Sequence, residues 1–162
     1  MERKDGSLQA QTTLIVKECI AVKLRLLTRA VTKIYNKALR PHGLTVSQMN
    51  ILVAASYIGQ AKQQDICHAL HLEKSTLSRD LARMRERGWV AESPGDDGRS
   101  SLLRVTAHGE KLLQRAFPAW RQAQQQAAEL LGERDIAALG RAAKTLRSSR
   151  TKGLNSGFRE EA

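Results

Sequence analysis

Two short helical patterns separated by only three residues constrain the fold of this chain most strongly. The first covers roughly Gln63 to Leu70, and the second covers roughly Lys74 to Arg87, followed by the stop signal Gly88. So short a link brings the second helix across the first at a steep angle. The sequence therefore predicts a helix-turn-helix in the middle of the chain.

A β-hairpin is predicted directly after the second helix. The segments 89–93 and 101–106 have the composition of short strands, and residues 94–99, Pro-Gly-Asp-Asp-Gly-Arg, are dense in turn formers. A hairpin that follows a helix-turn-helix forms a wing, so the pattern predicts a winged helix-turn-helix.

Four further helices are predicted around this unit. An amphipathic helix covers about 14–39 and ends before Pro41, and a second begins at Thr45, where Thr45 and Gln48 fit a capping box, and runs to about residue 58. A long helix follows the N-cap candidate Thr106 as far as Gly132, with a kink expected at Pro118, and a last helix covers about 133–147.

The predicted fold class is therefore mostly α (α+β), with six helices and a β-hairpin wing. We expect dimerisation helices at 14–42 and 106–148, a winged helix-turn-helix DNA-binding lobe at 44–105, and flexible tails at 1–12 and 149–162. The apolar faces of the first and the two last helices are broad, and faces of this width need more than one packing partner.

The charge balance suggests a polyanionic partner. The chain of 162 residues carries a formal charge of +11, and strongly basic proteins often bind nucleic acid. The charge lies mainly outside the helix-turn-helix, because residues 61–105 hold eight Lys or Arg against seven Asp or Glu. An interface must therefore be argued from individual residues.

The composition also limits the compartment. No apolar stretch approaches the roughly 20 residues that span a bilayer, and the charged N-terminus does not resemble a signal peptide. The two cysteines, Cys19 and Cys67, are too few for a disulfide framework. We expect a soluble, cytoplasmic protein with no membrane partner.

The second helix of the pair has one apolar side and one polar side. Leu77, Leu81 and Met84 share the apolar side, and Arg79 lies nearly opposite them. Arginine pairs bidentately with guanine in the major groove, and hydroxyl side chains reach bases or phosphates. A solvated surface helix would have the same pattern, but the preceding helix and the following wing favour DNA.

The first helix of the pair and the wing add candidate phosphate contacts. Gln63 and Gln64 stand at a helix N-terminus, and Arg99 stands at the predicted wing tip, braced by Asp97 and Gly98. The predicted DNA-contacting residues are Gln63, Gln64, Lys74, Ser75, Thr76, Ser78, Arg79, Arg83 and Arg99.

Four segments in this order resemble the MarR family: residues 74–79, Lys-Ser-Thr-Leu-Ser-Arg; residues 81–90, which end in Gly-Trp-Val; Asp97-Gly-Arg99; and residues 103–109, Leu-Arg-Val-Thr-Ala-His-Gly. Val-Thr replaces the commoner Leu-Thr. The resemblance implies a homodimer of winged helices on double-stranded DNA. It also implies repression at pseudo-palindromic sites that a small-molecule effector or an oxidant relieves.

Two sensor hypotheses follow. Cys19 lies roughly where the oxidant-sensing relatives carry their cysteine, although it sits among apolar residues as a small buried hydrophobe would. Cys67, His68 and His71 are spaced so that a metal ion could be held, but the turn itself needs these positions. We predict no metal and no cofactor.

Other functions have weaker support. The sequence contains no G-x-S-x-G, P-loop or H-E-x-x-H motif, so an enzyme is not predicted. A winged helix used for protein contact would favour an aromatic anchor over the Arg79 and Arg83 face. RNA binding lacks a stacking platform, since aromatic residues make up only 4%.

Overall fold

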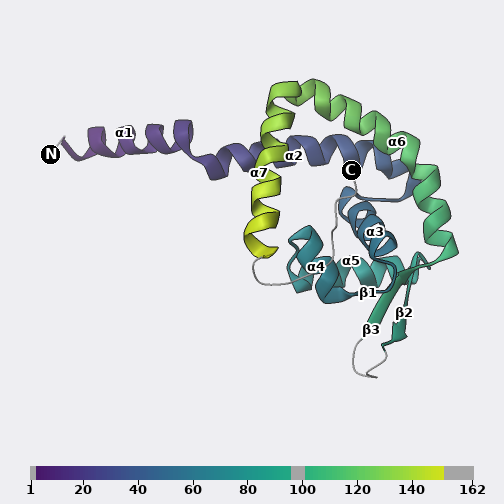
Figure 1. Ribbon diagram of the computed structural model, residues 1–162. Coiled ribbons are helices and arrows are strands. Elements are labelled where there is room, and N and C mark those ends of the chain that lie inside the picture. The colour runs from purple at the N-terminus through teal and green to yellow at the C-terminus, as the bar shows by residue number, and fades with distance from the viewer. Residues whose placement is uncertain (1–2, 96–100, 152–162) are drawn as a thin grey trace.

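The computed structural model describes residues 3–95 and 101–151, and Figure 1 shows their arrangement. Within these residues the fold is mostly helical with one small antiparallel sheet, as predicted. The elements in chain order are α1 Arg3–Glu18, α2 Ile20–Leu39, the 3-10 turn η1 Arg40–His42, α3 Val46–Ile58, β1 Ala61–Lys62, α4 Gln63–Leu70, α5 Lys74–Glu86, β2 Val90–Pro94, β3 Ser101–Val105, α6 Ala107–Leu131 and α7 Glu133–Thr151.

The two ends of the described chain differ from the prediction. One helix was expected from about 14 to 39, but the structure has α1 and α2, separated at Cys19, whose backbone is extended (φ −61°, ψ 111°). Residues 3–12, expected in a flexible tail, lie in α1, where few apolar residues repeat and the periodic signal is weak. At the other end α7 reaches Thr151, four residues beyond the predicted end.

The junction between α2 and α3 is fixed by side chains that cap the backbone. Thr45 and Gln48 form the predicted capping box: the Thr45 hydroxyl accepts from the Gln48 N–H, and the Gln48 side chain accepts from the Thr45 N–H (both 3.2 Å). The Asn36 side-chain oxygen accepts from the N–H of Val46 (2.8 Å). Helix α3 therefore starts in a position determined by α2.

The sheet has three strands in the order β1-β3-β2, all antiparallel. The two wing strands were predicted, and they pair from Val90 with Val105 to Pro94 with Ser101. The short strand β1 was missed, because two residues cannot establish an alternating pattern. Its pairing of Ala61 with Leu103 ties the start of α4 to the wing.

The core lies between the helix-turn-helix and the two long helices α2 and α6. The central buried side chains come from α2, α3, α4, α5, β3 and α6, so one continuous cluster joins the lobe to the flanking helices. Its fully buried large members are Leu39, Ile51, Leu52, Ile66, Leu77, Leu81, Met84 and Leu103.

Helix α6 begins against the first wing strand. The Thr106 hydroxyl accepts from the N–H of Gly109 (3.1 Å), which makes it the N-cap, and donates to the carbonyl of Gly88 (2.6 Å). Pro118 lies inside α6, which follows a curved path in Figure 1. Thr106 thus joins the end of the helix-turn-helix to the start of the long helix.

We expect Thr106→Val to lower the free energy of unfolding by about 1 kcal/mol, because the helix cap is lost while the shape is nearly kept. Thr106→Ser retains the hydroxyl and is the matched control. Chemical denaturation at a fixed protomer concentration measures both. Equal stability of the valine and serine variants would show that the cap contributes nothing.

Candidate nucleic-acid interface

Helices α4 and α5 meet at a tight turn that the sequence predicted residue for residue. His71 takes a left-handed conformation (φ 52°), and the N–H of Leu72 bonds to the carbonyl of Cys67 (3.0 Å), which closes α4. Leu77, Leu81 and Met84 are fully buried, as expected, and they seat α5 on the core. The opposite side of α5 is therefore turned to solvent.

The solvent side of α5 carries most of the candidate contacts. Lys74, Ser75, Thr76, Ser78, Arg79 and Arg83 are all exposed. Arg79 donates through Nε to the carbonyl of Ser75 one turn earlier (3.3 Å), so its side chain lies back along the helix. In this way α5 presents two guanidinium groups one turn apart, with short hydroxyl side chains around them.

The start of α4 carries two further candidate contacts, and both glutamine side chains have neighbours within the lobe. Gln63 donates through Nε2 to Oε1 of Glu92 on β2 (3.1 Å), so its amide is engaged within the fold. The side-chain Nε2 of Gln64 lies 3.4 Å from the ring Nε2 of His68, and Gln64 remains exposed. The backbone N–H of Lys62 bonds to the Asp65 carboxylate (3.0 Å), which caps the helix.

Three acidic residues of this lobe have partners within it. Asp80 accepts from the Ser47 hydroxyl (2.7 Å), and Glu92 forms an ion pair with Arg85 (2.7 Å). With Asp65 used as a cap, three carboxylates are occupied inside the lobe. Among the described residues, neither Arg79 nor Arg83 forms an ion pair.

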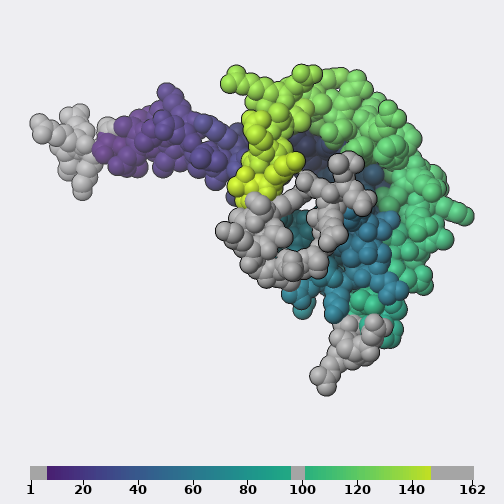
Figure 2. Space-filling view, in the orientation of Figure 1, coloured from purple at the N-terminus to yellow at the C-terminus, as the bar shows by residue number. Residues whose placement is uncertain are grey.

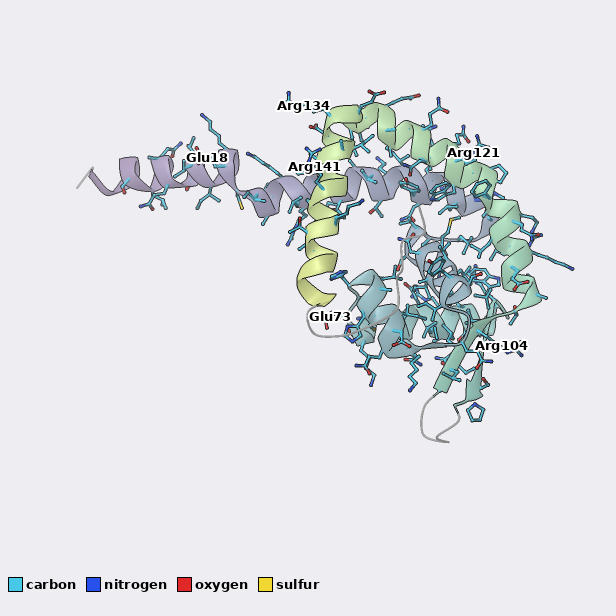
Figure 3. All side chains as sticks on the ribbon, in the orientation of Figure 1. Glu18, Glu73, Arg104, Arg121, Arg134 and Arg141 are labelled. Carbon is cyan, nitrogen blue, oxygen red and sulfur yellow. The ribbon has the colours of Figure 1, made fainter. Side chains whose placement is uncertain are left out.

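The wing contributes one basic residue that the sequence reasoning did not select. Arg104 on β3 is exposed, next to the fully buried Leu103, and Figure 3 shows it at the wing. The alternation of buried and exposed positions along the strand could have identified it. The predicted wing-tip residues Asp97, Gly98 and Arg99 lie outside the described residues.

The sensor candidates lie in unrelated places. Cys19 is half-buried at the break between α1 and α2, and Cys67 is half-buried in α4 against the core. Among the residues that the structure describes, no three His, Cys, Asp or Glu side chains gather as a metal site would require. Nor does any helix in the described ranges have the length and apolar character to cross a membrane.

Helices α2 and α6 are joined by a polar contact beside the core. The Tyr35 hydroxyl bonds to the side-chain oxygen of Gln124, and burial raises the pKa of the Tyr35 phenol above its usual value of 10.0. Tyr35 therefore stays protonated at neutral pH and acts as a donor.

Known proteins share this architecture. The M. tuberculosis transcriptional regulator MOSR, solved in complex with DNA, is 35% identical, with a TM-score of 0.67 over 80% of this chain and 99% of that one. A mutant E. coli MarR complexed with operator DNA is 18% identical, with a TM-score of 0.73 over 82% of this chain and 96% of that one, which is a likeness of fold.

The sequence comparisons agree with the structural ones. An HTH-type transcriptional regulator of Bacillus subtilis, YwoH, is 36% identical over 83 residues, which are 51% of this chain and 61% of that protein. The match thus spans about three fifths of that relative's length. The MarR family model matches residues 42–100, which include α3, α4, α5 and β2. Together with the 35% identity to MOSR over nearly the whole of that chain, this match shows that the protein belongs to the MarR family of transcription regulators.

Proposed function

We propose that this protein is a sequence-specific DNA-binding repressor that acts as a homodimer on a pseudo-palindromic operator. One observation carries the proposal: α5 is locked to the core by Leu77, Leu81 and Met84, and its opposite side presents Arg79 and Arg83 to solvent. A helix held this rigidly can be inserted in a major groove as a unit, where arginine distinguishes guanine from other bases.

The homodimer is supported by apolar side chains that the single chain leaves exposed. On α2, Ile20 is 72% exposed and Leu26 is 61% exposed, and on α6 Leu130 is 56% exposed. Further large apolar side chains are exposed on α1 and α7, and Figure 2 shows α1 extending away from the rest of the molecule. Most helical stability in proteins comes from the packing of an apolar face, so we propose that a second copy covers α1 and α2.

In such a dimer the two α5 helices would enter successive major grooves. The half-sites would then lie about one helical turn, roughly 34–36 Å, apart. A small-molecule effector would relieve repression by binding better to a dimer in which this spacing no longer fits. The family resemblance supports this part of the proposal.

We expect Arg79→Ala to weaken binding about 10- to 100-fold, because a lost bidentate contact to a base costs about 1–3 kcal/mol. The probe is a labelled duplex that the wild-type protein selects from a random pool, and fluorescence anisotropy at fixed salt measures the affinity. Arg121→Ala is the matched control, because it removes the same charge from an exposed position of α6 that Figure 3 shows far from the wing.

Three outcomes separate the candidate functions. Loss of affinity in the Arg79 variant alone supports a DNA reader. Equal losses in both variants would mean that charge attracts polyanions without recognition. Failure of the wild type to select any duplex would overturn the proposal and favour a winged helix that contacts another protein.

A further inference from the structure

One carboxylate joins three elements at the edge of the helix-turn-helix. Glu92 on β2 accepts from the Gln63 side chain at the start of α4 through Oε1 (3.1 Å) and pairs with Arg85 in the last turn of α5 through Oε2 (2.7 Å). Each carboxylate oxygen thus has its own partner.

The contact adds a side-chain link between the outer wing strand and the two helices of the helix-turn-helix. Strand β2 follows α5 after a short turn, and its backbone hydrogen bonds run to β3, which in turn pairs with β1 just before α4. Of the described β2 side chains, only Glu92 has a polar contact to α4 or α5. The angle between the wing and α5 therefore depends on the β1–β3 pairing, on the buried side chains at the base of the strand and on this carboxylate.

Glu92 contributes little to stability by itself. The Arg85 side chain is 38% exposed and that of Glu92 is 24% exposed, and ion pairs with this much solvent contribute modestly to folding. The geometry of the contact is nevertheless specific, because the Glu92 carboxylate bonds at the same time to Gln63 on α4 and to Arg85 on α5. The main consequence of the contact is therefore orientation.

We propose that Glu92 is a positioning residue that sets the angle of the wing relative to α5, with Arg85 as its principal partner. This inference rests on the proposed DNA-binding function. The Gln63 side chain, which donates to Glu92, holds β2 against the start of α4. The wing is then aimed at the flank of the operator while α5 occupies the groove.

Charge alone makes a competing prediction. An unpaired carboxylate at this edge would repel phosphates, so any variant that changes the local charge shifts the affinity for all DNA. The test therefore needs two variants of opposite charge change and a double variant that restores the balance. Glu92→Arg adds two positive charges, Arg85→Glu removes two, and the combination leaves the net charge unchanged.

The experiment uses two probes. One is the duplex that the wild type selects from a random pool, and the other is the same duplex shortened from both ends until the wild-type affinity has fallen to a lower plateau, at which the flanks no longer contribute. The ratio of the two affinities measures the contribution of the flanks. Arg121→Glu on α6 is the control for a loss of two charges elsewhere, and the thermal midpoint of each variant is recorded.

We expect both single variants to reduce the ratio about 3- to 30-fold, the range of couplings between neighbouring side chains. The double variant should recover most of the loss, because the ion pair is rebuilt in reverse. Shifts of opposite sign in the two single variants, or no recovery in the double variant, would overturn the positioning role. Failure of the wild type to select any duplex would overturn the proposed function, and this inference with it.

Discussion

Gly109→Ala is expected to destabilise the protein, whereas Gly140→Ala is expected to stabilise it. A Cβ added at Gly109 would lie 2.2 Å from the backbone oxygen of Trp89 and 2.7 Å from Cγ1 of Val105. At Gly140, in the exposed part of α7, nothing lies within 4 Å of the added atom. Both residues are helical, and the main difference between the two substitutions is the space available to the added atom.

The magnitudes follow from two opposing effects. Alanine is favoured over glycine by about 1 kcal/mol in a helix interior, which is the full expected gain at Gly140. At Gly109 overpacking opposes this gain and costs typically 1–3 kcal/mol or more. The Trp89 oxygen cannot retreat freely, because it accepts from the N–H of Thr106 (3.0 Å). We therefore expect a net loss of about 1–3 kcal/mol at Gly109.

Chemical denaturation at one protomer concentration measures both variants, because the stability of a dimer depends on concentration. A rise in stability for both would mean that α6 can move away from Trp89 without cost. If the loss at Gly109 is confirmed, the wing should also be affected, since Trp89 immediately precedes β2. Gly109 thus links the start of α6 to the position of the wing.

The parts of the fold that short-range chemistry determines were predictable from sequence. The Thr45 capping box, the three-residue turn before α5 and the buried side of Leu77, Leu81 and Met84 follow from residue type and spacing within one or two turns. The resemblance to the MarR family rests on other short segments, of which residues 74–79, 81–90 and 103–109 lie within the described ranges. These features are confirmed.

The features that were missed depend on partners distant in sequence. Gln63 bonds to Glu92, 29 residues away, and no local pattern reveals that contact. The pairing of Ala61 with Leu103 creates β1 in the same way. The break between α1 and α2 at Cys19 could not be predicted either, because no Gly or Pro marks it in the sequence. The DNA-contacting set as a whole remains a prediction.

The largest effect is expected from Leu26→Glu on α2. Leu26 is 61% exposed in the single chain, so the protomer can accept the change, but in the proposed dimer the side chain is covered. Burial of a leucine contributes about 1.5–3 kcal/mol, and a symmetric dimer loses two of them, so the dissociation constant should rise on the order of 10²- to 10⁴-fold.

Sedimentation over a dilution series measures this change, with Gln122→Glu as the control, because it adds the same charge at an exposed polar position of α6. The two outcomes lead to different views of the molecule. A dissociated Leu26 variant that still unfolds in a cooperative thermal transition and loses operator binding would show that recognition needs both copies, since one α5 reaches only one half-site. A dimer that survives the substitution would place the interface elsewhere, and the exposed apolar side chains of α1 and α2 would then need another partner.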